Sequence, residues 1–213
     1  MINRQKIGRR IGVNISIKLM IKNFFVNSTA LKKLIAFLLL FVSTNLAALE
    51  TSFQLHKADQ SESYGVSVGV GDSFFKQKEF NWSISYNRLE DTTITWNGKD
   101  INFALDTVDL MLNYRYYPKS YNAFIKSLIV EFQAGVGVAL TENKFTWSAL
   151  EQEKYFSEPG DVNGVIGFLV HKKFNKELAM HIGVKHYPDY SEFGDISSVV
   201  LGFTFIFGSN PGY

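Results

Sequence analysis

The sequence predicts an all-β protein, an eight-stranded antiparallel up-and-down transmembrane β-barrel preceded by a cleavable signal peptide. Three observations support this fold class. Segments of about ten residues alternate apolar side chains with small or polar ones, as strands do when one face meets an apolar medium. Aromatic residues make up 15% of the 213 residues, which suits a barrel with interfacial aromatic girdles. The final segment, residues 197–207, is rich in Phe and would be an aggregation hazard unless another strand paired with its edge.

The first 48 residues are predicted to be an N-terminal extension and signal peptide. Lys32 and Lys33 precede an apolar run at residues 34–42, and small residues follow up to Ala48. This order of charge, apolar core and small-residue cleavage zone is typical of a secretory signal. A membrane anchor is the alternative, but the uncharged run is short for a membrane span. We therefore expect one mature domain, a β-barrel over residues 49–213.

The formal charge of +2 arises from the N-terminal extension. Eight Lys and Arg residues, and no acids, precede Glu50; removing these eight from 22 leaves 14 basic against 20 acidic residues, a net of −6. We therefore expect no nucleic-acid partner for the mature domain. The absence of Cys excludes disulfides, thiolate metal sites and a Cys nucleophile. Met20 is an alternative start to Met1, which would shorten the extension.

The first four predicted strands cover residues 52–57, 64–71, 80–88 and 107–117. The first has the weakest pattern, with only Phe53 and Leu55 on its apolar side. The second sets Tyr and Val against Gly and Ser at every step, and the third sets Phe, Trp, Ile and Tyr against Asn and Ser. The fourth places five apolar residues opposite a parity that includes Asp109 and Arg115. Period-two alternation of this kind predicts an apolar face toward lipid and a small or polar face toward the lumen.

The last four predicted strands cover residues 125–140, 162–174, 178–187 and 197–207. Glu131 is on the inward parity of the first of these, and His171 is placed inward in the second, whose parity is ambiguous. His181 and Lys185 are inward in the third. A soluble β-sandwich is disfavoured because the polar face is rich in Gly, Ser and Asn, as a crowded small lumen requires. A soluble lipocalin-type barrel would instead have an apolar lumen and no large rings outside.

The connections alternate between short and long. Those after even-numbered strands are short, whereas residues 89–106 and 141–161 form long connections after odd-numbered strands. Asn97-Gly98 lies between alternating apolar residues, which predicts that its two strands continue beyond the membrane as a hairpin. The connection 141–161 has a net charge of −3. This asymmetry predicts short periplasmic turns, longer surface loops and two periplasmic termini.

The closing strand resembles the C-terminal signal of bacterial outer-membrane barrels, with Gly202 followed by Phe205 and Phe207. Val200 departs from the polar residue that is usual two positions before the Gly. Residues 51–207 as a whole resemble small eight-stranded outer-membrane barrels of the OmpA-like class. The resemblance implies location in the bacterial outer membrane, contact with its lipid and lipopolysaccharide, and recognition of the closing strand by the barrel assembly machinery. It does not specify an activity, because this class contains anchors, adhesins, pores and a few enzymes. We expect a monomer.

Six polar residues on the inward parity are the candidate lumen network: Asp109, Arg115, Glu131, His171, His181 and Lys185. We expect them to form an ion-paired plug, because unpaired buried charge is costly and side chains nearly fill an eight-stranded barrel. A proton or ion pathway through a narrow pore is the alternative. The His pair lacks supporting carboxylates at metal-ligand spacing, so we expect no metal and no cofactor.

His186 is in phase with the apolar, lipid-facing side of its strand, near the outer rim. The position resembles that of the outer-membrane lipid A deacylases, whose His-x-Ser pair and a later acid form a hydrolase triad on the outer wall. That resemblance implies His186 as base, Ser191 as nucleophile, and Asp195, Asp189 or Glu192 as the acid. The sequence departs from the pattern because the residue two after the His is proline. The other interpretation is an interfacial strand end with aromatic rings at headgroup level.

The expected function is that of a non-catalytic outer-membrane barrel. Its acidic, aromatic surface loops are expected to bind an extracellular ligand or to support envelope integrity, because they contain charge and rings but no coherent catalytic set. A lipid A deacylase-like serine hydrolase and a narrow small-solute pore are the two alternatives.

Overall fold

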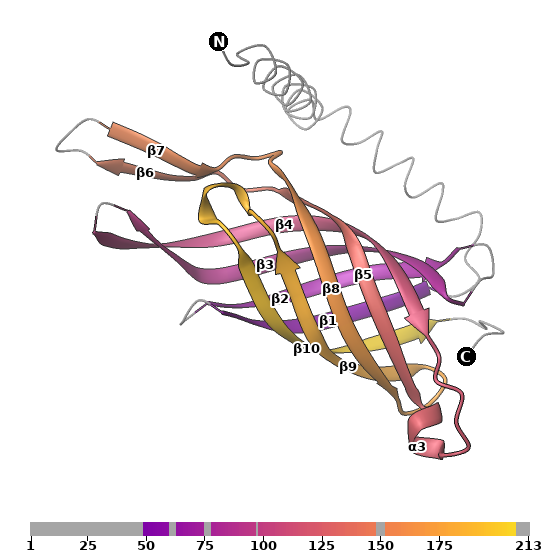
Figure 1. Cartoon of the computed structure of the whole chain (residues 1–213). Coiled ribbons are helices and arrows are strands. Elements are labelled where there is room, and N and C mark those ends of the chain that lie inside the picture. The colour runs from indigo at the N-terminus through magenta and orange to yellow at the C-terminus, as the bar shows by residue number, and fades with distance from the viewer. Residues whose placement is uncertain (1–48, 60–62, 75–77, 97, 148–151, 208–213) are drawn as a thin grey trace, which may run out of the picture.

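The computed structural model describes residues 49–59, 63–74, 78–96, 98–147 and 152–207 (Figure 1). The predicted signal peptide and the polar C-terminal tail lie outside the described residues. The strands are β1 Leu49–Ala58, β2 Tyr64–Ser73, β3 Phe80–Trp96, β4 Lys99–Tyr116, β5 Leu128–Ala139, β6 Asn143–Trp147, β7 Gln152–Ser157, β8 Val162–Lys173, β9 Leu178–Tyr187 and β10 Ile196–Phe207. Two short helices, α3 (Ala123–Lys126) and the 3-10 helix η1 (Ser191–Phe193), lie in connections.

Within the described residues, eight antiparallel strands form a closed barrel in the order β1-β10-β9-β8-β5-β4-β3-β2. This confirms the predicted eight-stranded antiparallel barrel. β1 pairs with β10 along its full length, from Leu49 opposite Phe207 to Ala58 opposite Ser198. The Phe-rich closing strand therefore has a neighbour on each side and presents no unpaired edge.

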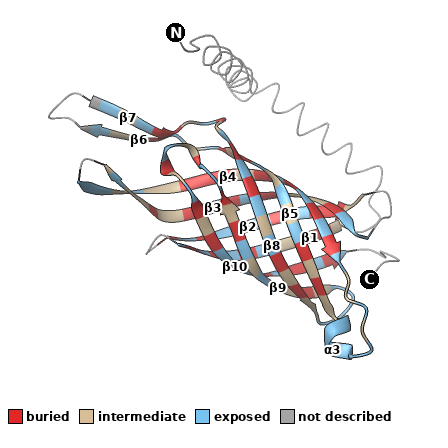
Figure 2. Cartoon of the chain, in the orientation of Figure 1, coloured by how far each residue is buried: buried red, intermediate tan, exposed pale blue. Residues whose placement is uncertain are grey.

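The barrel wall is apolar outside and polar inside. On β10, Leu201, Phe203 and Phe205 are exposed, whereas Ser198 and Thr204 are buried. The same alternation continues around the wall, and Figure 2 shows it as alternating colours along the strands. No helix among the described residues is long and apolar enough to cross a membrane. An apolar exterior around a polar, hydrogen-bonded interior is the arrangement of a barrel that spans a membrane with its strands.

The strands reach farther than predicted at the end opposite the termini. β3 and β4 pair out to Trp96 opposite Lys99, which confirms the hairpin predicted at the Asn-Gly pair. Gly98 has a φ of +74°, a left-handed conformation that Gly adopts without strain. The connection 141–161, predicted only as a loop, contains a second hairpin formed by β6 and β7. These two hairpins extend the end opposite the termini, which we call the outer end, beyond the barrel wall (Figure 1).

Two strand boundaries were predicted wrongly. The fifth predicted strand, 125–140, begins only at Leu128. Ile125 lies instead in α3, because the Asn122 side chain accepts hydrogen bonds from the backbone N–H groups of Phe124 and Ile125 and so starts a helical turn. The first strand is longer than its weak pattern suggested, since it pairs with both β2 and β10.

Candidate functional site

A charged cluster surrounds Arg115 on β4, in the end of the lumen that lies nearest the termini. Its Nη1 and Nη2 donate to the two carboxylate oxygens of Glu50 on β1, each at 2.7 Å, and its Nε donates to Glu131 on β5. His171 Nε2 lies 3.4 Å from the same Glu131 oxygen. All four side chains are buried. One guanidinium thus links β4 to the neighbouring β5 and, across the lumen, to β1, in the forked geometry that carboxylates favour.

Glu50 was missed by the sequence analysis because the first strand was predicted to begin at residue 52. Strand β1 begins at Leu49 and places Glu50 on the same parity as Gln54 and His56, all of them buried. Extending the alternation by one step toward the N-terminus would have found this residue. Glu50 matters because it binds both terminal nitrogens of Arg115.

A second charged cluster lies closer to the outer end. Lys185 Nζ on β9 donates to Asp109 Oδ2 on β4 at 2.9 Å, and the Tyr187 hydroxyl donates to the same oxygen at 2.7 Å. Thr107 donates to the other Asp109 oxygen at 3.1 Å, and Lys185 also reaches Asn87 Oδ1 at 3.3 Å. The carboxylate of Asp109 is fully buried, so these donors satisfy a charge that water does not reach.

Three buried imidazoles lie in the lumen. His181 Nδ1 is 3.2 Å from Thr204 Oγ1, and its ring centroid is 5.1 Å from that of His171. His56 Nδ1 is 3.3 Å from Ser198 Oγ. Among the described residues, no group of three or more His, Cys, Asp or Glu side chains could hold a metal ion. A lumen cavity bordered by Arg115 and Lys185 measures about 40 Å³, room for a few water molecules.

The structure pairs His186 with a serine that the sequence analysis did not consider. His186 Nδ1 lies 2.8 Å from the hydroxyl of Ser197, which stands directly opposite on β10. His186 is half-buried on the outward parity of β9, as predicted. The Ser197 backbone N–H donates to Asp59 Oδ1 at 3.3 Å. In the described part of the chain, no carboxylate contacts the imidazole, so the pair is a dyad without an orienting acid.

Ser191 and Asp195, the other members of the sequence-predicted triad, have different partners. The Ser191 hydroxyl donates to Asp161 Oδ2 at 3.2 Å, and its backbone N–H donates to Asn163 Oδ1 at 3.1 Å. Asp195 Oδ1 accepts from the backbone N–H of Asp189 at 3.0 Å. These bonds order the β9–β10 connection and do not bring either side chain to His186. Only the strand register reveals the Ser197 contact, because 11 residues separate it from His186.

The outer end of the barrel is closed by an aromatic cluster, which we call the outer cap and define as Trp96, Phe103, Phe145, Phe156, Tyr187, Tyr190 and Phe193. Its rings come from β3, β4, β6, β7, β9 and η1, and Tyr190 lies directly before η1. Phe156 is 1% exposed and lies 5.2 Å from Phe103 and 6.0 Å from Phe193 between ring centroids. Trp96 packs edge-on against Phe145 at 5.7 Å. The predicted aromatic loops therefore turn most of these rings inward and pack the connections into one unit.

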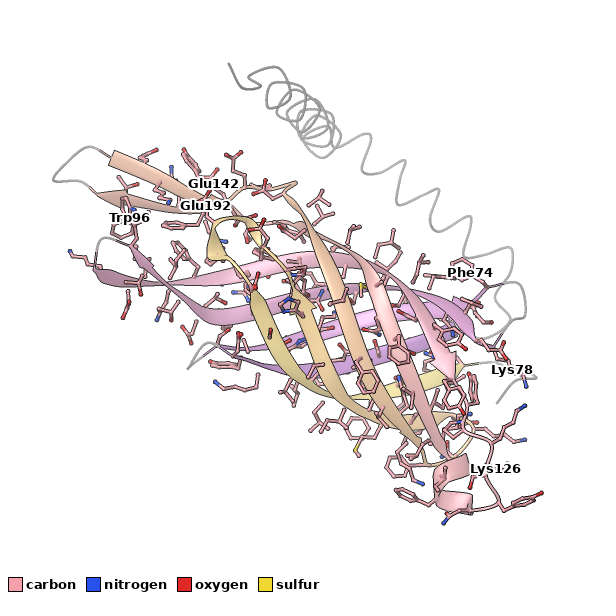
Figure 3. The ribbon with its side chains drawn as sticks, viewed as in Figure 1. Phe74, Lys78, Trp96, Lys126, Glu142 and Glu192 are labelled. Carbon is pink, nitrogen blue, oxygen red and sulfur yellow. The ribbon has the colours of Figure 1, made fainter. Side chains whose placement is uncertain are left out.

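The surface around the outer cap is acidic. Lys154 on β7 pairs with Glu192 of η1 at 3.4 Å, which ties the β6–β7 hairpin to the last connection. Lys144 lies 3.9 Å from both Glu142 and Glu153. The described acids that are at least partly exposed at this end are Asp59, Glu90, Asp91, Asp100, Glu142, Glu153, Glu158, Asp161, Asp189, Glu192 and Asp195, against Lys57, Arg88, Lys99, Lys144 and Lys154. Figure 3 shows Glu142 and Glu192 beside the cap residue Trp96.

Comparison with known proteins finds similarity only at the level of architecture. No protein-family model and no curated protein sequence matches the chain. The N-terminal β-barrel domain of Pseudomonas aeruginosa OprF is 14% identical, with a TM-score of 0.48 over 76% of this chain and 98% of that one. Yersinia pestis Ail, the attachment invasion locus protein, is 12% identical, with a TM-score of 0.44 over 75% of this chain and 96% of that one. The outer-membrane enzyme PagL is 14% identical, with a TM-score of 0.41 over 73% and 98%.

Proposed function

We propose that this protein is a non-catalytic outer-membrane barrel whose outer cap presents a rigid acidic surface to a cationic ligand outside the cell. The observation that supports this proposal is the packing of the cap. Rings such as Phe156 and Phe193 are buried among the connections, while carboxylates such as Glu142 and Glu192 remain on the surface. A surface that is held rigid by a packed core loses little conformational entropy when a ligand binds. Such a surface can therefore bind a ligand more tightly than a flexible tail with the same charges would. The alternative function of the same barrel is to support the integrity of the cell envelope.

The proposal places the chain in the outer membrane of a Gram-negative cell. Residues 1–48 would direct export, and the barrel assembly machinery would read Gly202, Phe205 and Phe207 in the closing strand. Phe205 and Phe207 point outward on β10, where a protein in the membrane could contact them. Outer-membrane lipid and lipopolysaccharide would surround the apolar wall, and closure within one chain is consistent with a monomer.

Binding to charged probes tests this proposal. The mature barrel in lipid nanodiscs is titrated with a lysine-rich peptide and, as the opposite charge, with heparin at physiological salt. The peptide should bind and heparin should not. Neutralising three surface acids, with Glu142→Gln, Glu153→Gln and Glu192→Gln together, should weaken peptide binding. Absence of peptide binding, or equal binding of heparin, would refute the proposal.

A second variant separates a built surface from net charge alone. Phe156→Ala removes the most buried ring of the cap without changing any charge. If the ligand is recognised by a rigid surface, this variant should lose affinity although its charge is intact. If Phe156→Ala binds the peptide as tightly as the wild type while the charge variant binds it more weakly, the attraction is non-specific and the proposed recognition is wrong.

A serine hydrolase acting on lipid is the second candidate, supported by the 2.8 Å contact between His186 Nδ1 and Ser197 Oγ. In this mechanism the imidazole takes the proton of Ser197 as the hydroxyl attacks an ester carbonyl, and later returns it to the leaving group. The pair lies on the lipid-facing side, so an acyl ester of a membrane lipid could approach it. The lack of a carboxylate on the imidazole predicts a slow enzyme.

The hydrolase candidate is tested on lipid A from cells that express the protein. Loss of an acyl chain that disappears in both Ser197→Ala and His186→Ala would establish the dyad. Ser191→Ala is the matched control, because Ser191 bonds Asp161 and not the imidazole. Unchanged lipid A mass spectra in cells with folded barrel would eliminate this candidate.

A further inference from the structure

We propose that the barrel end carrying the termini binds anionic phospholipid headgroups of the surrounding leaflet through a ring of lysines. The ring, which we call the lysine collar, consists of Lys78, Lys119, Lys126, Lys172, Lys173 and Lys176. Outside the lumen, the described acids at this end are Asp72, Glu79 and Glu177, and of these Asp72 is buried. Figure 3 shows Lys78 and Lys126 at this end and Glu142 and Glu192 at the opposite end. The two ends of the barrel therefore have opposite charge.

Lys172 is the central residue of the proposed site because it lies on the lipid-facing wall. On β8, Phe168 and Val170 have the outward parity, and Lys172 is the next residue in this series. Its strand neighbours are Leu128 on β5 and Met180 on β9. A cation on this face stands among apolar side chains, at the height where the wall ends and headgroups begin. The stem of such a lysine packs on the wall while its ammonium reaches the headgroups.

The ammonium of Lys172 is held in place at the rim. It donates a hydrogen bond to the Ser127 hydroxyl and lies 4.2 Å from the centroid of the Phe124 ring. Ser127 follows α3 directly, and Lys126, the last residue of α3, is exposed. Lys126 and Ser127 are adjacent in the chain, and Lys172 reaches Ser127 from β8. Ammonium and hydroxyl groups of this kind can donate hydrogen bonds to a phosphodiester.

Exposed apolar side chains accompany these lysines. Phe124 is 61% exposed, Ile125 is 41% exposed and Phe174 is 56% exposed. None of the residues of α3 is buried. Rings and lysines at a membrane boundary contact different depths of the leaflet, since the rings enter the edge of the acyl region and the ammonium groups reach the phosphates. A lipid leaflet covers both kinds of group at once.

The position on the outer wall distinguishes a lipid from other anionic partners. A cell-wall polymer or a soluble protein could reach the exposed Lys119 and Lys176 on the turns, but Lys172 continues the lipid-facing row of Phe168 and Val170. Each lysine near an anionic leaflet strengthens attraction by about five-fold. Two lysines on one site should therefore favour an anionic lipid over a zwitterionic one by about 25-fold.

Lipid retention measures the proposed preference. The mature barrel is reconstituted with phosphatidylcholine and phosphatidylglycerol in equal amounts and then released into mild detergent. Native mass spectrometry identifies the lipids that stay bound, and the ratio of phosphatidylglycerol to phosphatidylcholine gives the preference. The wild type should retain phosphatidylglycerol preferentially. The variant Lys126→Gln with Lys172→Gln should lose about 25-fold of that preference. The matched control, Lys144→Gln with Lys154→Gln, removes the same charge from the opposite end and should retain it.

Three outcomes would overturn the proposal: equal retention of both lipids by the wild type, an unchanged preference in the collar variant, or an equal loss in the control. Binding of purified cell-wall fragments without any lipid preference would also overturn it. Lys172→Arg keeps the charge and should restore most of the preference, which separates charge from a structural role. If the double variant does not fold, Lys126→Gln alone should still lower the preference about five-fold. The outer cap takes no part in this experiment, so its result is independent of the proposed ligand there.

Discussion

Replacing Arg115 with methionine should strongly destabilise the barrel. The guanidinium donates to both oxygens of Glu50, at 2.7 Å each, and to Glu131, and all three side chains are buried. Removing it takes three charge-assisted hydrogen bonds from two carboxylates in the lumen. Leaving buried charges without their partner costs about 3–5 kcal/mol, far more than the ion pair itself contributes relative to an apolar replacement. Retained contacts to Glu131 from His171 and Gln133 place the expected cost inside this range rather than above it.

The compensated variant makes this reasoning refutable. Adding Glu50→Gln and Glu131→Gln to Arg115→Met removes the stranded charges, so the triple variant should recover about 2 kcal/mol of the loss. Unfolding by urea in lipid vesicles, followed by tryptophan fluorescence, measures both variants. Lys144→Gln is the control, since its ion pairs with Glu142 and Glu153 are exposed, and its midpoint should stay unchanged. A single variant within 1 kcal/mol of wild type, or a triple variant that is no better than the single one, would contradict the ion-paired plug that the sequence predicts.

Three further predictions concern the wall, the cap and the barrel as a whole. Gly183→Ala should destabilise the barrel by about 1–3 kcal/mol, because an added Cβ would lie 2.0 Å from the backbone oxygen of Phe168. Gly164→Ala should be tolerated, because its Cβ would be 3.8 Å from the nearest atom. The midpoints of urea unfolding measure both effects. Phe156→Ala should open the β6–β7 hairpin to protease while the barrel stays folded, and Tyr155→Ala on the exposed side should not; mass spectrometry of the fragments locates the cuts. The mature domain should migrate differently on detergent gels before and after boiling, and identical migration would contradict a closed transmembrane barrel.

The closing strand illustrates how far sequence reasoning reached. Alternation in residues 197–207 predicted which side chains face outward, and burial along β10 agrees residue by residue. This works because side-chain direction in a strand depends only on parity, which is a local property. The same reasoning found the β3–β4 hairpin from the Asn-Gly pair. It missed α3, where a single Asn122 side chain starts a helical turn inside an apolar stretch that reads equally well as strand.

The sequence by itself determined the fold class, the inward and outward faces and the inward position of residues such as Asp109 and Lys185. Only the tertiary structure decided their partners, because a partner depends on register between strands that are distant along the chain. Lys185 meets Asp109 across 76 residues, and His186 meets Ser197 rather than Ser191 because β9 and β10 pair in one register. A shift of one residue would exchange the two faces, and no single strand contains the information that excludes it. Closure of the whole barrel supplies that information, since every strand must then pair in register with the strand on each side of it.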